Sequence, residues 1–439
     1  MVISAFAVFM LAQEARALLT RLERVKPFAL IEPMLPAAAL RSDAQLATER
    51  YLMAGRRELR ASVVGFLAWL HGAREQRASA AEAQRRFTLL RLKFNAVLTQ
   101  FDLFNDVISQ RSERDVGVWL SGLDAVATDA LQLPGIYDTP PLMCYLDRGA
   151  GAAIRRARTR LPGGGDSPVA IIRVPRERMI GSGIAASLIH EVGHQASALL
   201  DLPASLRPLL QGMQRNERGG GTAWRLFERW IGEILSDFWS CARLGIAATL
   251  GLMSVVGLPR PFMFRLNLDD PHPVPWLRVR LSCAMGRAMF PHPQWQRLER
   301  LWSDYYPLEG LEAQTRKLFA EVLAAMPGFV ALLVDHRAPA LRGRSLREVL
   351  GVAQRQPAQL DASFSFWSAQ PAAMYRAAPS LVFAVLGQAR ANARLTPEQE
   401  SHLFAKLLTH WALRSAIDAT PTPAVRPRQE TGLAAQRAH

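Results

Sequence analysis

Cysteine and lysine are both scarce in this sequence. The 439 residues include three cysteines, Cys144, Cys241 and Cys283, which are an odd number and show no C-x-x-C spacing. This pattern argues against a disulfide framework and a zinc ribbon, and we expect buried thiols in a reducing compartment. Only four lysines accompany the arginines that produce the net charge of +15. The arginine bias, together with abundant alanine, is typical of a GC-rich bacterial coding sequence.

Long hydrophobic runs are also missing. A membrane-spanning helix needs about twenty apolar residues, and the apolar runs at the N-terminus and at 244–258 are shorter than that. The N-terminal run also lacks the basic segment that begins a secretory signal. We therefore expect packed helices at both places, no membrane association and a cytoplasmic bacterial protein, with export as an effector left open.

The positive charge is not organised into a nucleic-acid-binding motif. Segment 154–162 and pairs such as Arg85 and Arg86 are typical of solvated helix faces, and no basic run alternates with aromatic residues. We expect no dedicated nucleic-acid site. A basic helical surface for nucleic acid or an anionic membrane remains an alternative that rests on net charge alone.

The hydrophobic pattern predicts a mainly α (α+β) fold with a small sheet. Apolar residues recur at spacings of three and four before residue 132, and a cluster of Pro and Gly then breaks the helical pattern. Two short apolar segments, 142–147 and 169–175, predict strands. We expect four parts, which are a helical N-terminal region (1–132), a core (133–290), a helical C-terminal region (291–417) and a disordered tail (418–439).

The chemistry is concentrated in "SLIHEVGHQASALL", residues 187–200. On a helix, His190 and His194 project from one face and can bind the same metal ion. Glu191 lies at the edge of that face, where it can reach a metal-bound water without being a ligand. Gly193 lowers helix propensity but allows another backbone to approach closely.

A second helix carries a carboxylate pair with the same spacing. In "RWIGEILSDFWS", Glu233 and Asp237 are four residues apart within a strongly apolar stretch. A catalytic zinc site needs three protein ligands and one open position, and a carboxylate is an acceptable third ligand. A solvated helix face is the alternative for these two residues.

These two motifs together resemble the gluzincin metalloproteases, in which an HExxH helix is followed by a helix that bears Glu-x-x-x-Asp. The resemblance covers residues 169–281 and implies a zincin-like catalytic core, a Zn²⁺ cofactor and a peptide or protein substrate. It makes Glu233 the third ligand and Asp237 the acceptor of a hydrogen bond from a ligand imidazole. In zincin folds the strand before the HExxH helix is usually an edge that pairs with substrate, and 169–175 occupies that place.

A third segment, "DDPHPVPWLRVRL" (269–281), is similar to the His-Pro followed by Arg of heat-shock-type and CAAX-prenyl-type metalloproteases. That similarity makes His272 and Arg278 candidates to stabilise an oxyanion or to bind the substrate backbone. A loop histidine without a catalytic role is an equal alternative.

The expected function is zinc-dependent peptide hydrolysis with Glu191 as general base. The alternative is a catalytically silent zincin scaffold, in which the helical regions at either end bind a partner protein.

Overall fold

The computed structural model describes residues 2–27, 34–148, 151–176, 181–216, 221–267 and 269–419. The fold is mainly α with one small sheet, and 72% of it is helical, as the sequence predicts. Most of the expected disordered tail, residues 420–439, lies outside the described residues.

The elements follow the chain in three groups. The first helices are α1 (Ala5–Leu22), α2 (Ser42–Gly72), α3 (Ala80–Ser109) and α4 (Arg114–Leu131). The sheet and the next helices are β1 (Leu142–Asp147), β2 (Ala153–Arg155), β3 (Ala170–Pro175), α5 (Ser182–Leu199), α6 (Leu202–Asn216), α7 (Thr222–Leu244), α8 (Ile246–Val256), α9 (Arg260–Met263) and α10 (Pro275–Met289). The last are α11 (Gln294–Tyr305), α12 (Ala313–Val334), α13 (Leu346–Val349), α14 (Pro357–Ala369), α15 (Pro371–Arg376), α16 (Pro379–Ala391) and α17 (Pro397–Ala419).

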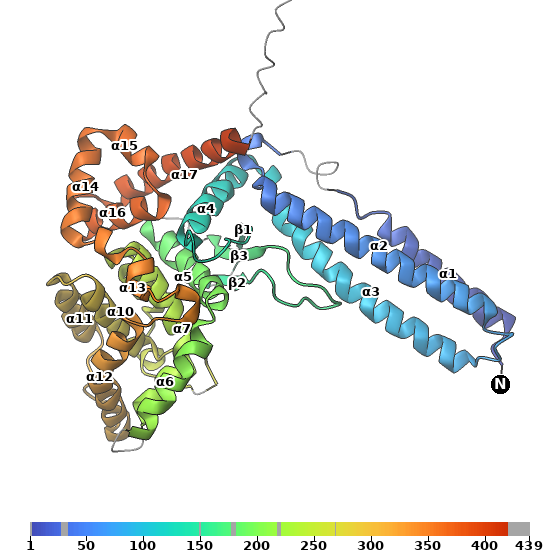
Figure 1. Cartoon of the computed structure of the whole chain (residues 1–439), viewed down its shortest axis with the longest axis horizontal. Coiled ribbons are helices and arrows are strands. Elements are labelled where there is room, and N and C mark those ends of the chain that lie inside the picture. The colour runs from blue at the N-terminus through green and yellow to red at the C-terminus, as the bar shows by residue number, and fades with distance from the viewer. Residues whose placement is uncertain are drawn as a thin grey trace, which may run out of the picture.

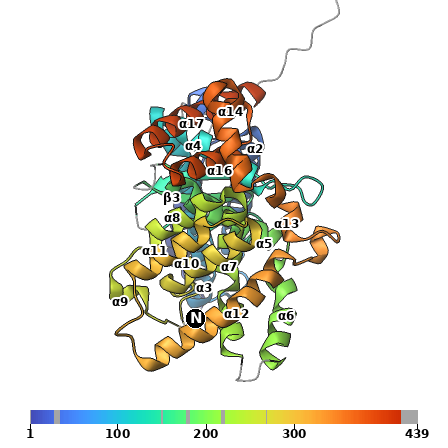
Figure 2. The ribbon, with the colours of Figure 1, turned by 90° about the vertical axis from the view of Figure 1, so that its left-hand side faces the viewer.

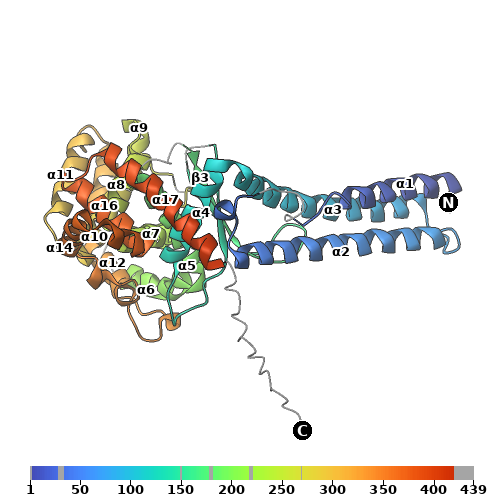
Figure 3. The same ribbon diagram turned by 90° about the horizontal axis from the view of Figure 1, so that it is seen from above.

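Helices α1, α2 and α3 form an arm that projects from a globular body (Figures 1 and 3). At 1.5 Å per residue, the 31 residues of α2 and the 30 of α3 each extend about 45 Å. The arm has a hydrophobic core of its own, which includes Leu18, Leu59 and Phe87. At the far end, the backbone N–H of Ile3 donates to the carbonyl of Ala78 and ties the start of α1 to the turn between α2 and α3.

Helix α4 belongs to the body, although the sequence pattern places it in the N-terminal helical region. Its buried Leu120, Leu123 and Val126 lie in the core of the body, packed with β1, α5 and α17. Among the helices, the change from the core of the arm to the core of the body therefore falls between α3 and α4, and the sheet contributes residues to both cores. Figure 2 shows the body end-on, with α17, α16 and α14 above α7 and α10, and α12 and α6 below them.

The sheet joins the arm to the body. Its strand order is β1-β3-β2, with β1 parallel and β2 antiparallel to β3. Because side chains alternate along a strand, Met143 and Ile171 pack into the core of the arm, whereas Cys144 and Ile172 pack into the core of the body. Both predicted strands form, as β1 and β3.

The expectation that 169–175 is an edge strand is wrong. β3 is hydrogen-bonded on both sides, so neither of its edges is free for a substrate. The edge next to it is β2, a three-residue strand that the sequence pattern did not indicate. β2 is held in place partly by Gln195 of α5, whose side-chain oxygen accepts from the backbone N–H of Ala157 at 2.8 Å.

A buried ion pair anchors α4 to β1. Arg111, which is 1% exposed, makes two hydrogen bonds to the carboxylate of Asp124, at 2.9 and 3.2 Å. The same two side chains bind the backbone carbonyl and N–H of Cys144, both at 2.7 Å. Cys144, Cys241 and Cys283 are all buried and free, as expected from their spacing.

The apolar segment 244–258 is a packed helix. It forms α8, which lies against α5 and α7. Among the described residues, one helix, α12, is long and apolar enough to cross a membrane by length and composition alone. This is weak evidence, because a core helix passes the same test, and α12 packs on α10 and α7.

Candidate metal centre

The site is built where α5 crosses α7. Gly193 permits the contact, since a Cβ at this position would lie 2.7 Å from the Cα of Ser236 and 3.1 Å from the Cβ of Trp239. The opposite side of α5 is apolar, with Ile189 and Val192 fully buried in the core of the body. α5 and α7 therefore make close backbone contact on the face of α5 that carries the polar residues.

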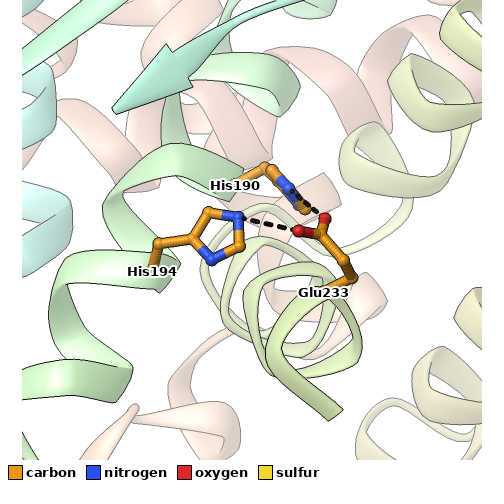
Figure 4. A group of neighbouring side chains, drawn as sticks. All are labelled: His190, His194 and Glu233. Atoms are coloured by element: carbon orange, nitrogen blue, oxygen red, sulfur yellow. Dashed lines mark ion pairs between the residues drawn. The ribbon is translucent and has the colours of Figure 1, made fainter. Parts of the chain in front are cut away.

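Three candidate ligands converge at this crossing. His190 and His194 extend from α5 towards the carboxylate of Glu233 on α7 (Figure 4). The Nε2 atom of His190 lies 3.2 Å from Oε2 of Glu233, and Nε2 of His194 lies 3.4 Å from Oε1. One ligand atom from each residue lies within 4.8 Å of the others. This group could hold a metal ion.

The carboxylate of Glu233 fits a ligand better than a structural ion pair. Its Oε2 atom is buried and has no hydrogen-bond partner, although nitrogen atoms of His190, His272 and Arg278 lie 3.2 to 3.6 Å away. The nitrogens are close enough for ion pairs, but their geometry does not satisfy the directions a hydrogen bond needs. An oxygen left unpaired among donors is the arrangement expected of an atom that faces a cation.

Asp237 orients the first histidine. Its Oδ1 lies 2.8 Å from Nδ1 of His190, and because a carboxylate can only accept, we infer that Nδ1 carries the proton. When the ring is neutral, the Nε2 lone pair of His190 is directed towards Glu233. This is the arrangement that fixes the tautomer of a metal-ligating imidazole.

Arg278 forms a two-point ion pair with Asp237. Its Nε donates to Oδ2 of Asp237 at 2.6 Å and its Nη2 to Oδ1 at 2.9 Å. The guanidinium is buried, so both sides of this pair are desolvated. Arg278 therefore lies behind His190 through Asp237, and it also contributes to the lining of a hollow next to Glu191.

The charges of the site are strongly coupled. Burial alone would lower the pKa of His190, but its hydrogen bond to Asp237 and the nearby carboxylate of Glu233 raise it to about 9. Burial and the charge of His190 lower the pKa of His194 to about 4. Burial opposes ionisation of Glu233 and Asp237, yet His190 and His272 hold the pKa of Glu233 well below its usual range, and Arg278 and His190 bring that of Asp237 to about 2. His194 and both carboxylates are thus in the states that a metal ion requires.

Glu191 borders a small hollow beside the three candidate ligands. Burial raises the pKa of its carboxyl above the usual value, and the charge of His190 opposes that rise. The hollow has a volume of about 130 Å³. Its lining is contributed by α5, α7, α8, α10, His272 and the start of the β2 segment: Gly151, Ala152, Ala186, Ser187, His190, Glu191, Asp237, Ser240, Ala248, Leu252, Val255, His272, Arg278 and Ser282.

His272 reaches the site from the loop before α10. Its Nε2 lies 3.2 Å from Oε2 of Glu233, and its Nδ1 lies 2.6 Å from Oδ1 of Asp270. The ring is about half exposed, so it stands at the mouth of the hollow. The nearby carboxylate of Glu233 raises the pKa of His272, with burial opposing it.

Sequence reasoning missed several contributors to the site. Gly151 and Ala152 lie just before β2 and line the hollow, and Leu252 of α8 lines it from the other side. No motif marks these residues, since small and aliphatic side chains become part of a site only through the packing that surrounds it. Asp270, which contacts His272, follows an acidic neighbour in a loop and carries no distinguishing signal either.

All seven candidate residues of the sequence analysis meet at one place. His190, His194 and Glu233 form the group that could hold a metal ion, and the other four surround it. A metal ion with a carboxylate beside an open hollow is suited to the activation of water. The sequence matches no family model, and neither a curated protein nor a solved structure matches the chain at a significant level.

Proposed function

We propose that this protein is a zinc-dependent peptidase with a gluzincin-type centre in a zincin-like core. The observation that carries the proposal is the convergence of His190, His194 and Glu233 from two crossing helices, with Glu191 free of the ligand group and next to a hollow. A solvated helix face does not account for the carboxylates, because Glu233 and Asp237 are both buried.

Zinc is the metal that this donor set favours. Two imidazoles and one carboxylate are the ligands of a common class of catalytic zinc sites, which keep a further position open. His190 and His194 would bind through Nε2, and Glu233 through its unpaired carboxylate oxygen. When bound, zinc acts as a Lewis acid that makes hydroxide available near pH 7.

Side chains of the protein would accept, hold and donate the protons of the reaction. Glu191 would accept the proton of the attacking water and later pass it to the leaving amine, for which a buried carboxylate with a raised pKa is suited. Asp237, held by Arg278, would keep the Nδ1 proton on His190 throughout. His272, half exposed at the mouth of the hollow, would donate a hydrogen bond to the oxygen that becomes negative.

The substrate would be a peptide held in extended form. β2 pairs on one side with β3, and among the described residues no strand occupies its other side. Residues 151–152, which lead into β2, line the hollow next to Glu191. A peptide that adds to this edge by main-chain hydrogen bonds would lie beside the hollow that Glu191 borders.

The test of the proposal is metal content. We expect about one equivalent of zinc per chain in the wild-type protein and little or none in Glu233→Ala, because two imidazoles alone do not complete the site. Elemental analysis after exposure to zinc and desalting measures both. The matched control is Glu228→Ala on the same helix, which removes a carboxylate that binds Gln211 and Gln214 outside the site and should leave the zinc content unchanged.

Zinc affinity should rise with pH up to about pH 9. In the metal-free protein His190 carries a proton below that value, and the metal must displace it from Nε2. His194 and Glu233 are already deprotonated, so one proton is released and the affinity should rise about tenfold per pH unit before it levels off. Titration against a chelator of known affinity at several pH values measures the slope. A slope of two protons would contradict the neutral state of His194.

The same pKa values fix the direction of the stability change in the metal-free protein. Because the pKa of His190 is raised from 6.5 to about 9, its contribution to the free energy of unfolding is complete below pH 6.5 and is lost as the pH rises through 9. The contribution of Asp237, whose pKa is lowered from 3.8 to about 2, is complete above 3.8 and is lost as the pH falls through 2.

A further inference from the structure

Helix α1 exposes an apolar face at the far end of the arm. Phe6, Phe9 and Met10 lie on its exposed side, and Phe6 and Phe9 are 72% and 54% exposed; Val2, which precedes the helix, is 50% exposed. Spacings of three and four residues place Phe9 and Met10 on the same face of the helix as Phe6, and Val2 continues this apolar stripe before the helix begins. The opposite side of α1, with Leu11 and Leu18, is buried against α2 and α3.

The sequence of this part of α1 is unusual for a helix that borders water. No Asp, Glu, Lys or Arg occurs before Glu14, so the first turns are apolar on every side. A helix of this kind is ordinarily buried on all its faces. Only one of its faces is covered by the arm, and the stripe defined by Val2, Phe6, Phe9 and Met10 therefore indicates a binding surface.

The size of the stripe argues against a second copy of the chain as its occupant. If an aromatic side chain offers on the order of 200 Å², the four side chains at their exposed fractions present roughly 400 Å². A stable dimer buries about 800 Å² per partner, so this stripe is too small by about half. Insertion of a few side chains into a lipid interface has no such area requirement.

The charges around the stripe select the kind of lipid. Exposed charges lie at both ends of the stripe: Arg74, Glu75 and Arg77 in the turn at the tip of the arm, and Glu14, Arg16, Arg21, Glu23 and Arg24 in the later part of α1 and just after it. Arginines outnumber glutamates at each end, so a net positive charge flanks the apolar stripe, whereas its middle carries no charge. This arrangement fits a membrane surface at which the aromatic rings of the stripe enter the boundary between headgroups and acyl chains, while the arginines contact anionic headgroups.

We propose that the stripe on α1 docks the arm onto the surface of an anionic membrane. The arm would then hold the body, and the metal centre within it, at a lipid surface without a membrane-spanning helix. This inference departs from the sequence-based expectation of no membrane association, since the exposure of the stripe is visible only in the folded arm. It is independent of the proposed peptidase activity.

The experiment compares full-length proteins in flotation with lipid vesicles. One set of vesicles contains phosphatidylcholine alone, and the other contains phosphatidylcholine with phosphatidylglycerol. The test variant is Phe6→Glu with Phe9→Glu, and the control is Phe262→Glu with Phe366→Glu, two body residues that are 52% and 51% exposed. Both double variants change the net charge by the same amount, and circular dichroism checks that each is folded.

We expect the wild type and the control to float with the anionic vesicles. The arm variant should bind the anionic vesicles at least about tenfold more weakly than the wild type. The reason is that two aromatic rings no longer enter the lipid and two carboxylates face anionic headgroups. Hydrogen exchange of wild-type residues 5–10 should slow when anionic vesicles are added.

Several results would overturn the assignment. They are an absence of wild-type binding to anionic vesicles, equal binding to neutral vesicles, and an arm variant that binds like the control. A dimer in sedimentation that Phe6→Glu with Phe9→Glu dissociates, without vesicle binding, would make a second copy the occupant instead.

Discussion

Glu191→Gln should lower the rate of peptide cleavage by about 10²- to 10⁴-fold while the zinc content stays at the wild-type level. The reason is positional. Glu191 lies beside the candidate ligands without belonging to the group that could hold the ion, so its amide analogue removes a base and no ligand. The measurement is cleavage of a mixed peptide library, with zinc determined by elemental analysis on the same samples.

The matched control for Glu191→Gln is Glu299→Gln. Glu299 of α11 forms an ion pair with Arg287 of α10 at 2.9 Å and does not line the hollow. The substitution therefore removes one carboxylate charge, as Glu191→Gln does, without changing the site. Cleavage by this variant should equal that of the wild type. Full activity in Glu191→Gln would contradict the general-base role, and zinc without cleavage in every variant would favour a scaffold that binds a metal and performs no chemistry.

The ligand set could be predicted because helical spacing is short-range. His190 and His194 share a face by the pitch of the helix alone, and Glu233 and Asp237 do so for the same reason. That the two helices meet requires one more piece of information, which the small Gly193 supplies. The composition around the carboxylates, with Trp230 and Phe238 nearby, indicated a buried face, and both carboxylates are buried.

Features that depend on long-range pairing could not be predicted in this way. β2 has three residues and forms by pairing with β3, so no local pattern marks it. The direction of Arg278 is a similar case. The motif in 269–281 identified Arg278 as a candidate site residue. Which groups its guanidinium contacts, here Asp237, is decided by the packing of α10 against α7.

The projection of the arm also escapes sequence analysis. The spacing of apolar residues in α2 and α3 predicts that one stripe of each helix is buried, and it does not say against which partner. The structure pairs these helices with each other and with α1, apart from the body. A helix such as α4 has the same kind of pattern and packs elsewhere.

Gly193→Ala should destabilise the protein and weaken the metal site together. The new Cβ would lie 2.7 Å from the Cα of Ser236 and 3.0 Å from its carbonyl oxygen, so backbone must move. Overpacking of this kind costs about 1–3 kcal/mol of unfolding free energy. Because Ser236 lies between Glu233 and Asp237 on α7, the shift separates both carboxylates from the histidines, and a misplacement near 1 Å can cost about 10²-fold in cleavage.

Gly183→Ala, in the first turn of the same helix, separates crowding from the change of residue type. No atom lies within 4 Å of the Cβ it would add, so its free energy of unfolding should stay equal or rise by up to about 1 kcal/mol through helix propensity. Denaturant unfolding of the metal-free proteins compares the two variants, and zinc affinity is measured separately. If Gly193→Ala matched Gly183→Ala in both quantities, the close crossing of α5 and α7 could not be what sets the distances between the histidines and Glu233.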